Sequence, residues 1–343
     1  MRATVLLGLL LTTPILAQDE PATPPTPDNI IHVSTQLVTL DALVEDKKTH
    51  NLIGGLDRSD FQLTEDGAPQ NLTYFDHDQL PLSIVFLFDI TDSVRPALKP
   101  LAKGALEVLA HLKPQDEVSV MAFSSHTELL QDFTTDRLQA AIAIDKASTM
   151  KTSEGAFVHE CMYEAIDQAM RSQVPNSRRV LVWLTDGTSN LENKFTQKEM
   201  GRESPPILHT EKEDIERLQR TGIVVSGLIE HSTLGDVVVT AALLEGTRFG
   251  DIKNFATLTG GPVLKTSKKE VADRLSDLID DLRSRYTLGY RPSTFRPSGT
   301  FCKLTLQLSP TYLQTHPTPP PSDITISTRG GHFRWRQSIL RNR

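Results

Sequence analysis

The chain has 343 residues, a formal net charge of −7 at pH 7 and two cysteines. This length is sufficient for two domains with a sizeable core. The mild acidic excess, without a run of basic residues, excludes the electrostatic footprint of a nucleic-acid-binding protein. The sequence has no H-E-x-x-H pair and no G-x-S-x-G elbow, so zinc-dependent hydrolysis and serine-triad catalysis have no support.

The N-terminus is typical of an export signal. Met1-Arg2 precedes an apolar run from Val5 to Leu10, and Pro14 to Ala17 completes the pattern of a signal peptide cleaved after Ala17. Because the apolar run is too short to anchor the chain in a membrane, we expect a periplasmic or extracellular protein. Residues 18–29 contain four prolines and are expected to form a flexible linker.

The next segment, residues 30–80, is predicted to form short β-strands. Apolar and polar residues alternate in part from Gln36 to Glu45, and Phe61 to Thr64 precedes a turn at Glu65-Asp66-Gly67. A β segment of this size buries little surface by itself.

Residues 81–285 are predicted to form an α/β domain, because apolar strand-like runs alternate with helical patterns. Such alternation is typical of a doubly wound, mostly parallel sheet with helices on both faces. We expect strands at 83–89, 117–123, 179–184 and 223–229, and helices at 96–111, 160–172, 214–220, 251–258 and 270–285.

One predicted strand ends in a cluster of oxygen-bearing side chains. The apolar run from Ile84 to Phe88 stops at Asp89, Thr91 and Ser93. A run without polar alternation is typical of a strand covered on both faces, and ligands of such sheets bind at the carboxyl ends of strands. A carboxylate and two hydroxyls are hard oxygen donors of the type that Mg²⁺ accepts. The alternative is a turn that caps the following helix.

A second predicted strand repeats this design. The apolar run from Val180 to Leu184 leads into Thr185, Asp186 and Gly187. Because the carboxyl ends of parallel strands lie at the same edge of a sheet, Asp89 and Asp186 can converge on one ion.

Strand patterns return after Arg285. Tyr286 to Tyr290, Gly299 to Leu308 and Asp323 to Arg329 are the predicted strands. Since neither end of the chain is large enough for a core of its own, we expect residues 286–343 to pack with residues 30–80 in one small β-sandwich. Two separate β modules are the competing arrangement.

The two cysteines, Cys161 and Cys302, lie far apart in the sequence. Export permits a disulfide between them, but nothing in the sequence places them within bonding distance. We expect two buried free thiols.

The two strand ends resemble the von Willebrand factor type A domain, whose metal-ion-dependent adhesion site reads D-x-S-x-S followed by a distant Thr and an Asp in a T-D-G-type loop. The corresponding segments here are D-I-T-D-S, from Asp89, and L-T-D-G, around Asp186. The resemblance implies that Thr91 and Ser93 bind Mg²⁺, or Mn²⁺ or Ca²⁺, directly. Asp89 and Asp186 are then ligands directly or through water.

Both ends of the chain extend the resemblance. The phrase from Asp60 to Gln70 is similar to the opening of the acidobacterial von Willebrand factor A-related family, and the segment Leu288-Gly289-Tyr290 is similar to its closing part. That family ends in an R-x-G-Y-like sequence, where this chain has His332 in place of the usual aromatic residue.

The chain departs from the family at the third part of the adhesion site. The expected Thr falls on Ala156, whose methyl group cannot coordinate a cation. Either Thr152 or Ser153 supplies the missing oxygen, or water does, or the site is weak or empty.

The resemblance implies a non-enzymatic, secreted protein that mediates protein binding or adhesion through a partly degenerate metal site. In the family, an open coordination position of the ion accepts an acidic side chain of a partner protein. The residues expected around that position, and so expected to set partner choice, are Asp92, Ser124, Ser125, Thr188 and Ser189.

A second hypothesis is phosphoryl transfer. The D-x-T-x-S segment also looks like the aspartyl-phosphate motif of haloacid-dehalogenase-type enzymes, in which Asp89 is the nucleophile. Against it, no lysine has a distinctive setting for this chemistry, and short motifs of this kind have low specificity.

Overall fold

The computed structural model of the chain describes residues 37–77, 80–152, 156–186, 208–230, 251–294 and 296–334. The expected signal peptide and linker, residues 1–29, lie outside these ranges. In the part of the chain that is described, no helix is both long and apolar enough to cross a membrane.

A six-stranded sheet forms the centre of the α/β region. Its strands are β5 (Leu82–Asp89), β6 (Glu117–Phe123), β7 (Thr127–Thr134), β8 (Arg178–Thr185), β9 (Val224–Glu230) and β10 (Val263–Thr266). They lie in the order β10-β9-β8-β5-β6-β7, and β7 alone among them is antiparallel to its neighbour. Because the chain continues from β5 to β6 on one side and later adds β8 on the other, the ends of β5 and β8 lie at the switch point of the sheet.

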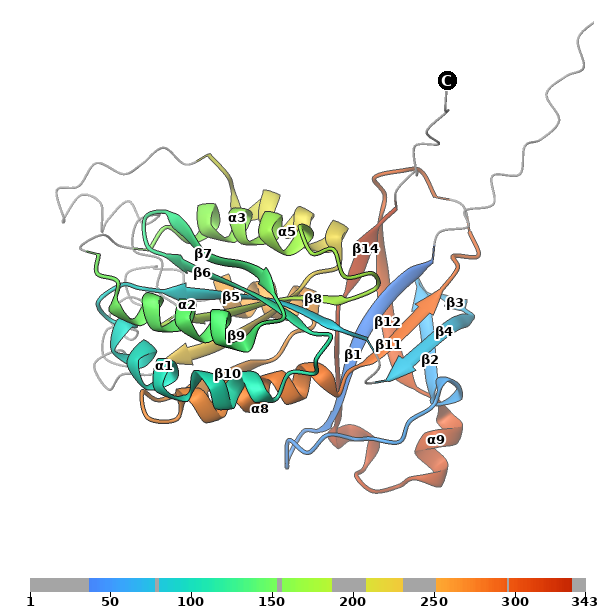
Figure 1. Ribbon diagram of the computed structural model, residues 1–343. Helices are drawn as coiled ribbons and strands as arrows, with labels where there is room; N and C mark the ends of the chain where they lie inside the picture. Colours follow the sequence, from blue (N-terminus) through green and yellow to red (C-terminus); the bar gives the residue numbers. More distant parts are fainter. Residues whose placement is uncertain are drawn as a thin grey trace, which may run out of the picture. The chain divides into compact units, whose positions relative to one another are not determined.

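Helices cover both faces of this sheet (Figure 1). The helices are α1 (Arg95–Ala110), α2 (Arg137–Thr149), α3 (Val158–Met170), α5 (Glu211–Thr221), α7 (Asp251–Thr259) and α8 (Val271–Arg283). Ile84 and Phe86 of β5 share a core with α1, α2 and α8, whereas Val85 and Leu87 share a second core with α3, α5 and α7. The uninterrupted apolar run of β5 is thus explained, since both of its faces are buried.

Strands from the two ends of the chain form two four-stranded antiparallel sheets, in the orders β13-β1-β11-β4 and β14-β12-β2-β3. The strands are β1 (Val38–Asp46), β2 (Phe61–Glu65), β3 (Ala68–Gln70), β4 (Leu72–His77), β11 (Tyr286–Tyr290), β12 (Phe301–Leu308), β13 (Ile324–Thr328) and β14 (Gly331–Phe333). Short helices at Arg58–Asp60, Pro310–Thr315 (α9) and Pro321–Asp323 connect them.

The pairing in these sheets is between the early and the late strands. β1 lies between β11 and β13, with Val38 opposite Tyr290 and Val44 opposite Ile326, and β2 pairs with β12. The inward residues of both sheets form one apolar cluster, which includes Leu40 and Leu306. The predicted fold class is therefore confirmed: a mostly parallel α/β sheet is accompanied by a β-sandwich made from N-terminal and C-terminal strands.

Both cysteines are buried free thiols, as expected from their spacing. Cys161 lies on α3 in the α/β region, and Cys302 lies on β12 in the sandwich.

Candidate functional site

The carboxylate of Asp89 is the centre of the predicted site. It is the last residue of β5, and its exposed fraction is 0%. One oxygen, Oδ1, accepts hydrogen bonds from the backbone nitrogen of Thr91 at 2.9 Å and from Thr91 Oγ1 at 2.6 Å. The other oxygen, Oδ2, accepts a hydrogen bond from Thr185 Oγ1 at 3.0 Å. The chain therefore turns around Asp89 directly after the strand and holds it in one orientation.

Thr91 and Ser93 lie together beyond Asp89. The Thr91 side chain is buried, and its Oγ1 lies 3.3 Å from Ser93 Oγ, while Ser93 is exposed. The cluster thus runs from a buried carboxylate through a buried hydroxyl to an exposed one. Three hard oxygen donors on one short segment, open to solvent at one end, are suited to a Mg²⁺-like ion that keeps part of its water.

Asp186 brings a second carboxylate to this edge of the sheet. The parallel pairing of β5 with β8 places Phe88 opposite Leu184, so the residues that follow each strand leave the sheet side by side. Burial, and after it the charge of Asp186, raise the pKa of Asp89 to about 7. A cation bound beside Asp89 would favour the charged form of this carboxylate.

Thr185 is a residue of this cluster that the sequence reasoning did not assign. It is the last residue of β8, it is buried, and it holds the second oxygen of Asp89. The L-T-D-G segment contains this hydroxyl directly before Asp186, so the sequence offered a signal for Thr185 as well.

The other predicted site residues differ in accessibility. Asp92 and Ser125 lie at or near the surface, and Asp92 forms an ion pair with Arg95 at 2.7 Å. Ser124 is only 2% exposed, so its side chain offers a partner almost no surface. Thr152 is partly buried, whereas Ser153, Thr188 and Ser189 lie outside the described residues.

Ala156, at the position of the expected Thr, belongs to the apolar core. Its side chain is buried in the cluster that includes Val85 and Leu87, and the next residue, Phe157, donates a backbone hydrogen bond to the carbonyl of Ser124 at 2.8 Å. The backbone at Ala156 is thus tied to the segment that follows β6.

We predict that Ala156→Thr tightens Mg²⁺ binding by about tenfold, because one added hydroxyl supplies a donor to a site short of oxygens. Ala156→Val is the matched control, since it has the shape of Thr without the hydroxyl. Calorimetric titration with Mg²⁺ measures both. Equal affinities of the two variants would show that no ligand is missing at this position.

The von Willebrand factor type A domain family matches residues 84–188, a range that contains β5, Asp89 and Asp186. The comparison with curated proteins finds no match. Among solved structures, BatB from Bacteroides thetaiotaomicron is 14% identical with a TM-score of 0.41, covering 59% of this chain and 98% of that chain.

Two further solved structures are similar. The von Willebrand factor domain of the type V pili tip protein Mfa5 from Porphyromonas gingivalis is 10% identical, with a TM-score of 0.39 over 59% of this chain and 95% of that one. The proximal thread matrix protein 1 from the mussel byssus, with a zinc-occupied MIDAS motif, is 14% identical, with a TM-score of 0.42 over 64% of this chain and 49% of that one. At these identities and TM-scores the similarities say nothing about the ligand or partner of this chain.

Proposed function

We propose that the von Willebrand factor type A domain of this chain binds a divalent cation of the Mg²⁺, Mn²⁺ or Ca²⁺ type and, through it, a carboxylate of a partner protein. Thr91 and Ser93 are the proposed direct ligands, and Asp89 and Asp186 bind directly or through water. The observation that carries the proposal is the contact of Asp89 with Thr91, and of Thr91 with Ser93, beside the charge of Asp186.

The chemistry of such a site favours binding over catalysis. A cation with few protein ligands keeps an open coordination position, which attracts a carboxylate strongly. Asp92 and Ser125 border this position and are the proposed contacts of a partner. Because of the signal-like residues 1–17, the proposed place of action is outside the cytoplasm.

The contacts of Asp89 support cation binding, directly or through water, more than the alternative of phosphoryl transfer. A nucleophilic carboxylate must approach its substrate with a free oxygen. Both oxygens of Asp89 accept hydrogen bonds, and the side chain has no exposed surface.

Calorimetric titration of the full chain with Mg²⁺ and with Mn²⁺ tests the proposal. We expect a saturable signal in the wild type and none in Asp186→Ala, because this substitution removes a carboxylate from the site without touching either core. Asp280→Ala is the control, since Asp280 is an exposed carboxylate on α8 that belongs to neither the proposed ligands nor the proposed partner contacts. Unchanged binding by Asp186→Ala would refute the assignment of the ligands.

A further inference from the structure

A second cluster of metal-binding residue types lies in the β-sandwich, on different residues from the site above. Glu65 ends β2, Cys302 lies on β12 and His332 lies on β14, three neighbouring strands of one sheet. Cys302 is directly opposite His332 in the ladder, and Glu65 is opposite Leu304. The three side chains offer a carboxylate oxygen, a sulfur and an imidazole nitrogen, all within 4.8 Å of one another.

These three residues are buried, with exposed fractions of 3% for Glu65, 0% for Cys302 and 5% for His332. Buried polar groups require partners. The sulfur of Cys302 lies 4.0 Å from the carbonyl oxygen of Thr300, and the side chains of Glu65 and Arg334 also interact with the thiol. Glu65 and His332 are in close contact with each other.

His332 has hydrogen-bond partners at both ring nitrogens. Its Nε2 lies 3.1 Å from Glu65 Oε1 and 3.2 Å from the hydroxyl of Tyr290, and its Nδ1 lies 3.3 Å from the carbonyl oxygen of Phe333. A neutral imidazole carries one N–H. When Nδ1 carries this proton and donates it to Phe333, Nε2 presents its lone pair to the side of the ring on which Glu65 lies.

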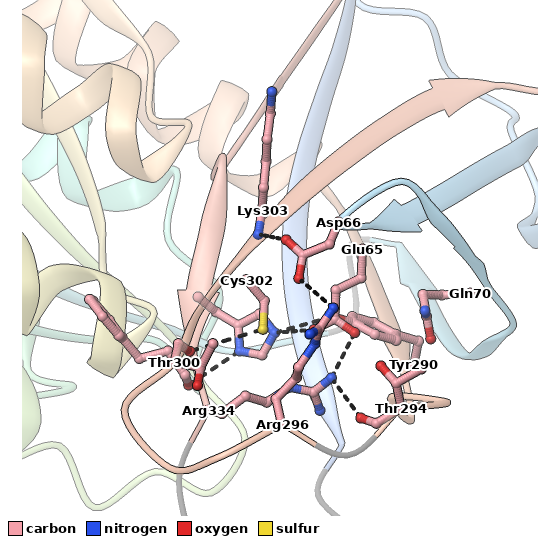
Figure 2. A network of polar contacts seen from close by, with 12 residues as sticks. Glu65, Asp66, Gln70, Tyr290, Thr294, Arg296, Thr300, Cys302, Lys303 and Arg334 are labelled. Carbon is pink, nitrogen blue, oxygen red and sulfur yellow. Dashed lines mark hydrogen bonds and ion pairs between the residues drawn. The ribbon is translucent and has the colours of Figure 1, made fainter.

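A metal ion between Nε2 and Oε1 fits this tautomer of His332. With Nδ1–H donated to Phe333, the lone pair of Nε2 is directed at the cation, which is the usual arrangement of a ligating histidine. Arg334 Nη2 donates a hydrogen bond to Glu65 Oε2 at 2.7 Å (Figure 2). The other oxygen, Oε1, lies 3.1 Å from His332 Nε2. Ligating carboxylates are commonly oriented by an outer hydrogen bond of this kind.

We propose that Glu65, Cys302 and His332 form a binding site for a thiophilic divalent cation, with Zn²⁺ as the best fit. A set of one thiolate, one imidazole and one carboxylate is typical of zinc, whereas Mg²⁺ and Ca²⁺ prefer oxygen alone. Water or the hydroxyl of Tyr290, which lies 3.2 Å from His332 Nε2, completes the tetrahedral set. His332 also lines a cavity of about 400 Å³.

The bound ion links β2, β12 and β14, because each strand contributes one of its ligands. Binding forms a sulfur–metal bond and releases the thiol proton to solvent, and the affinity therefore increases with pH. Because the ion binds the folded sandwich and not a preformed site in the unfolded chain, it raises the midpoint of thermal unfolding.

Cobalt provides a direct test on the full chain, because a thiolate bound to Co²⁺ gives a charge-transfer band in the near ultraviolet and a tetrahedral site gives strong visible bands. We expect both bands in the wild type, and we expect Zn²⁺ to remove them by displacement. Cys302→Ser should lose the charge-transfer band. Cys161→Ser, the other buried cysteine, should retain it, and so should Asp186→Ala, whose substitution affects the first site alone.

A second variant covers the case in which Cys302→Ser fails to fold, as judged by circular dichroism. His332→Gln keeps the thiolate but weakens Co²⁺ binding by more than about tenfold, because it removes the imidazole ligand. A wild-type chain that folds but gives no charge-transfer band would overturn the proposal. A band that persists in folded Cys302→Ser, or that is unchanged in affinity in folded His332→Gln, would overturn it as well.

Discussion

Removal of residues 286–343 is expected to expose β1 to hydrogen exchange along most of its length. This truncation deletes β11 and β13, the two strands between which β1 lies, and it deletes β12, the partner of β2. The inward residues of β1 lose Leu288 and Leu306 from their shared core at the same time. We expect amides 38–44 to exchange at least about a hundredfold faster, because a strand without ladder or core opens with almost no free-energy cost.

The α/β region provides the internal reference for this measurement. The amide of Val85 lies in β5, whose neighbours β6 and β8 remain in the truncated chain. Its protection should fall much less than that of β1, and the unpaired edges of β1 should promote aggregation. Equal protection of residues 38–44 with and without residues 286–343 would mean that the N-terminal strands form a module of their own.

Arg178→Met is expected to lower the free energy of unfolding by about 3 kcal/mol, the range observed when one partner of a buried ion pair is removed. Arg178 begins β8, and its side chain pairs with Asp41 of β1 at 3.2 Å. The same guanidinium donates to the carbonyl of Leu282 at 2.5 Å and to Thr287 Oγ1 at 2.8 Å. One buried cation thus joins the end of α8 and strands β8, β11 and β1.

The pH dependence of this effect has a definite sign. Burial opposes the ionisation of Asp41, but the charges of Arg178 and Arg285 outweigh it and lower the pKa of Asp41 below its usual 3.8. A group with a lowered pKa stabilises the fold above 3.8 and loses that contribution as the pH falls through the lowered value. The difference in the free energy of unfolding between wild type and Arg178→Met should therefore be largest near pH 7 and should decrease as the pH falls into the acid range.

Denaturant unfolding of Arg178→Met and of Arg179→Met measures this difference. Arg179 is the matched control, because it is the next residue of the same strand and forms no ion pair with any residue in the described ranges. A double-mutant cycle with Asp41→Asn isolates the pairwise energy. Additive effects in that cycle would show that the ion pair does not couple the two strands.

The sequence predicted the elements that are buried on both faces. β5, β6 and β9 are mostly apolar and are buried at every residue, and their predicted and observed limits agree within a residue or two. The helical stripe that ends at Leu282 was equally clear, since α8 buries one apolar side against β5 and its neighbours.

The elements that sequence reasoning missed have weak patterns for physical reasons. β7 is an edge strand and is partly exposed throughout, so it lacks a continuous apolar run. α2 packs through small residues such as Ala140, Ala143 and Ala147, which produce little contrast between its two sides. Neither pattern stands out without knowledge of the neighbouring elements.

The two proposed sites also differ in how far the sequence predicts them. Asp89, Thr91 and Ser93 are close in the sequence, so their spacing alone predicted a cluster. Glu65 and His332 are separated by most of the chain, and strand pairing through β12 brings them together. The sequence showed that His332 replaces the usual aromatic residue of the family. It did not show that Glu65 and Cys302 lie beside His332, because strand pairing determines this.

Anomalous diffraction from crystals of the full chain grown with Mn²⁺ tests the proposed cation site, because it shows the position of the bound ion. We predict an anomalous peak about 2 Å from Thr91 Oγ1 and Ser93 Oγ, at the ends of β5 and β8. The peak should be absent from crystals of Asp186→Ala. Well-ordered density for Thr91 and Ser93 without a peak between them, at a Mn²⁺ concentration that saturates the calorimetric signal, would contradict the assignment of a cation site to this edge of the sheet.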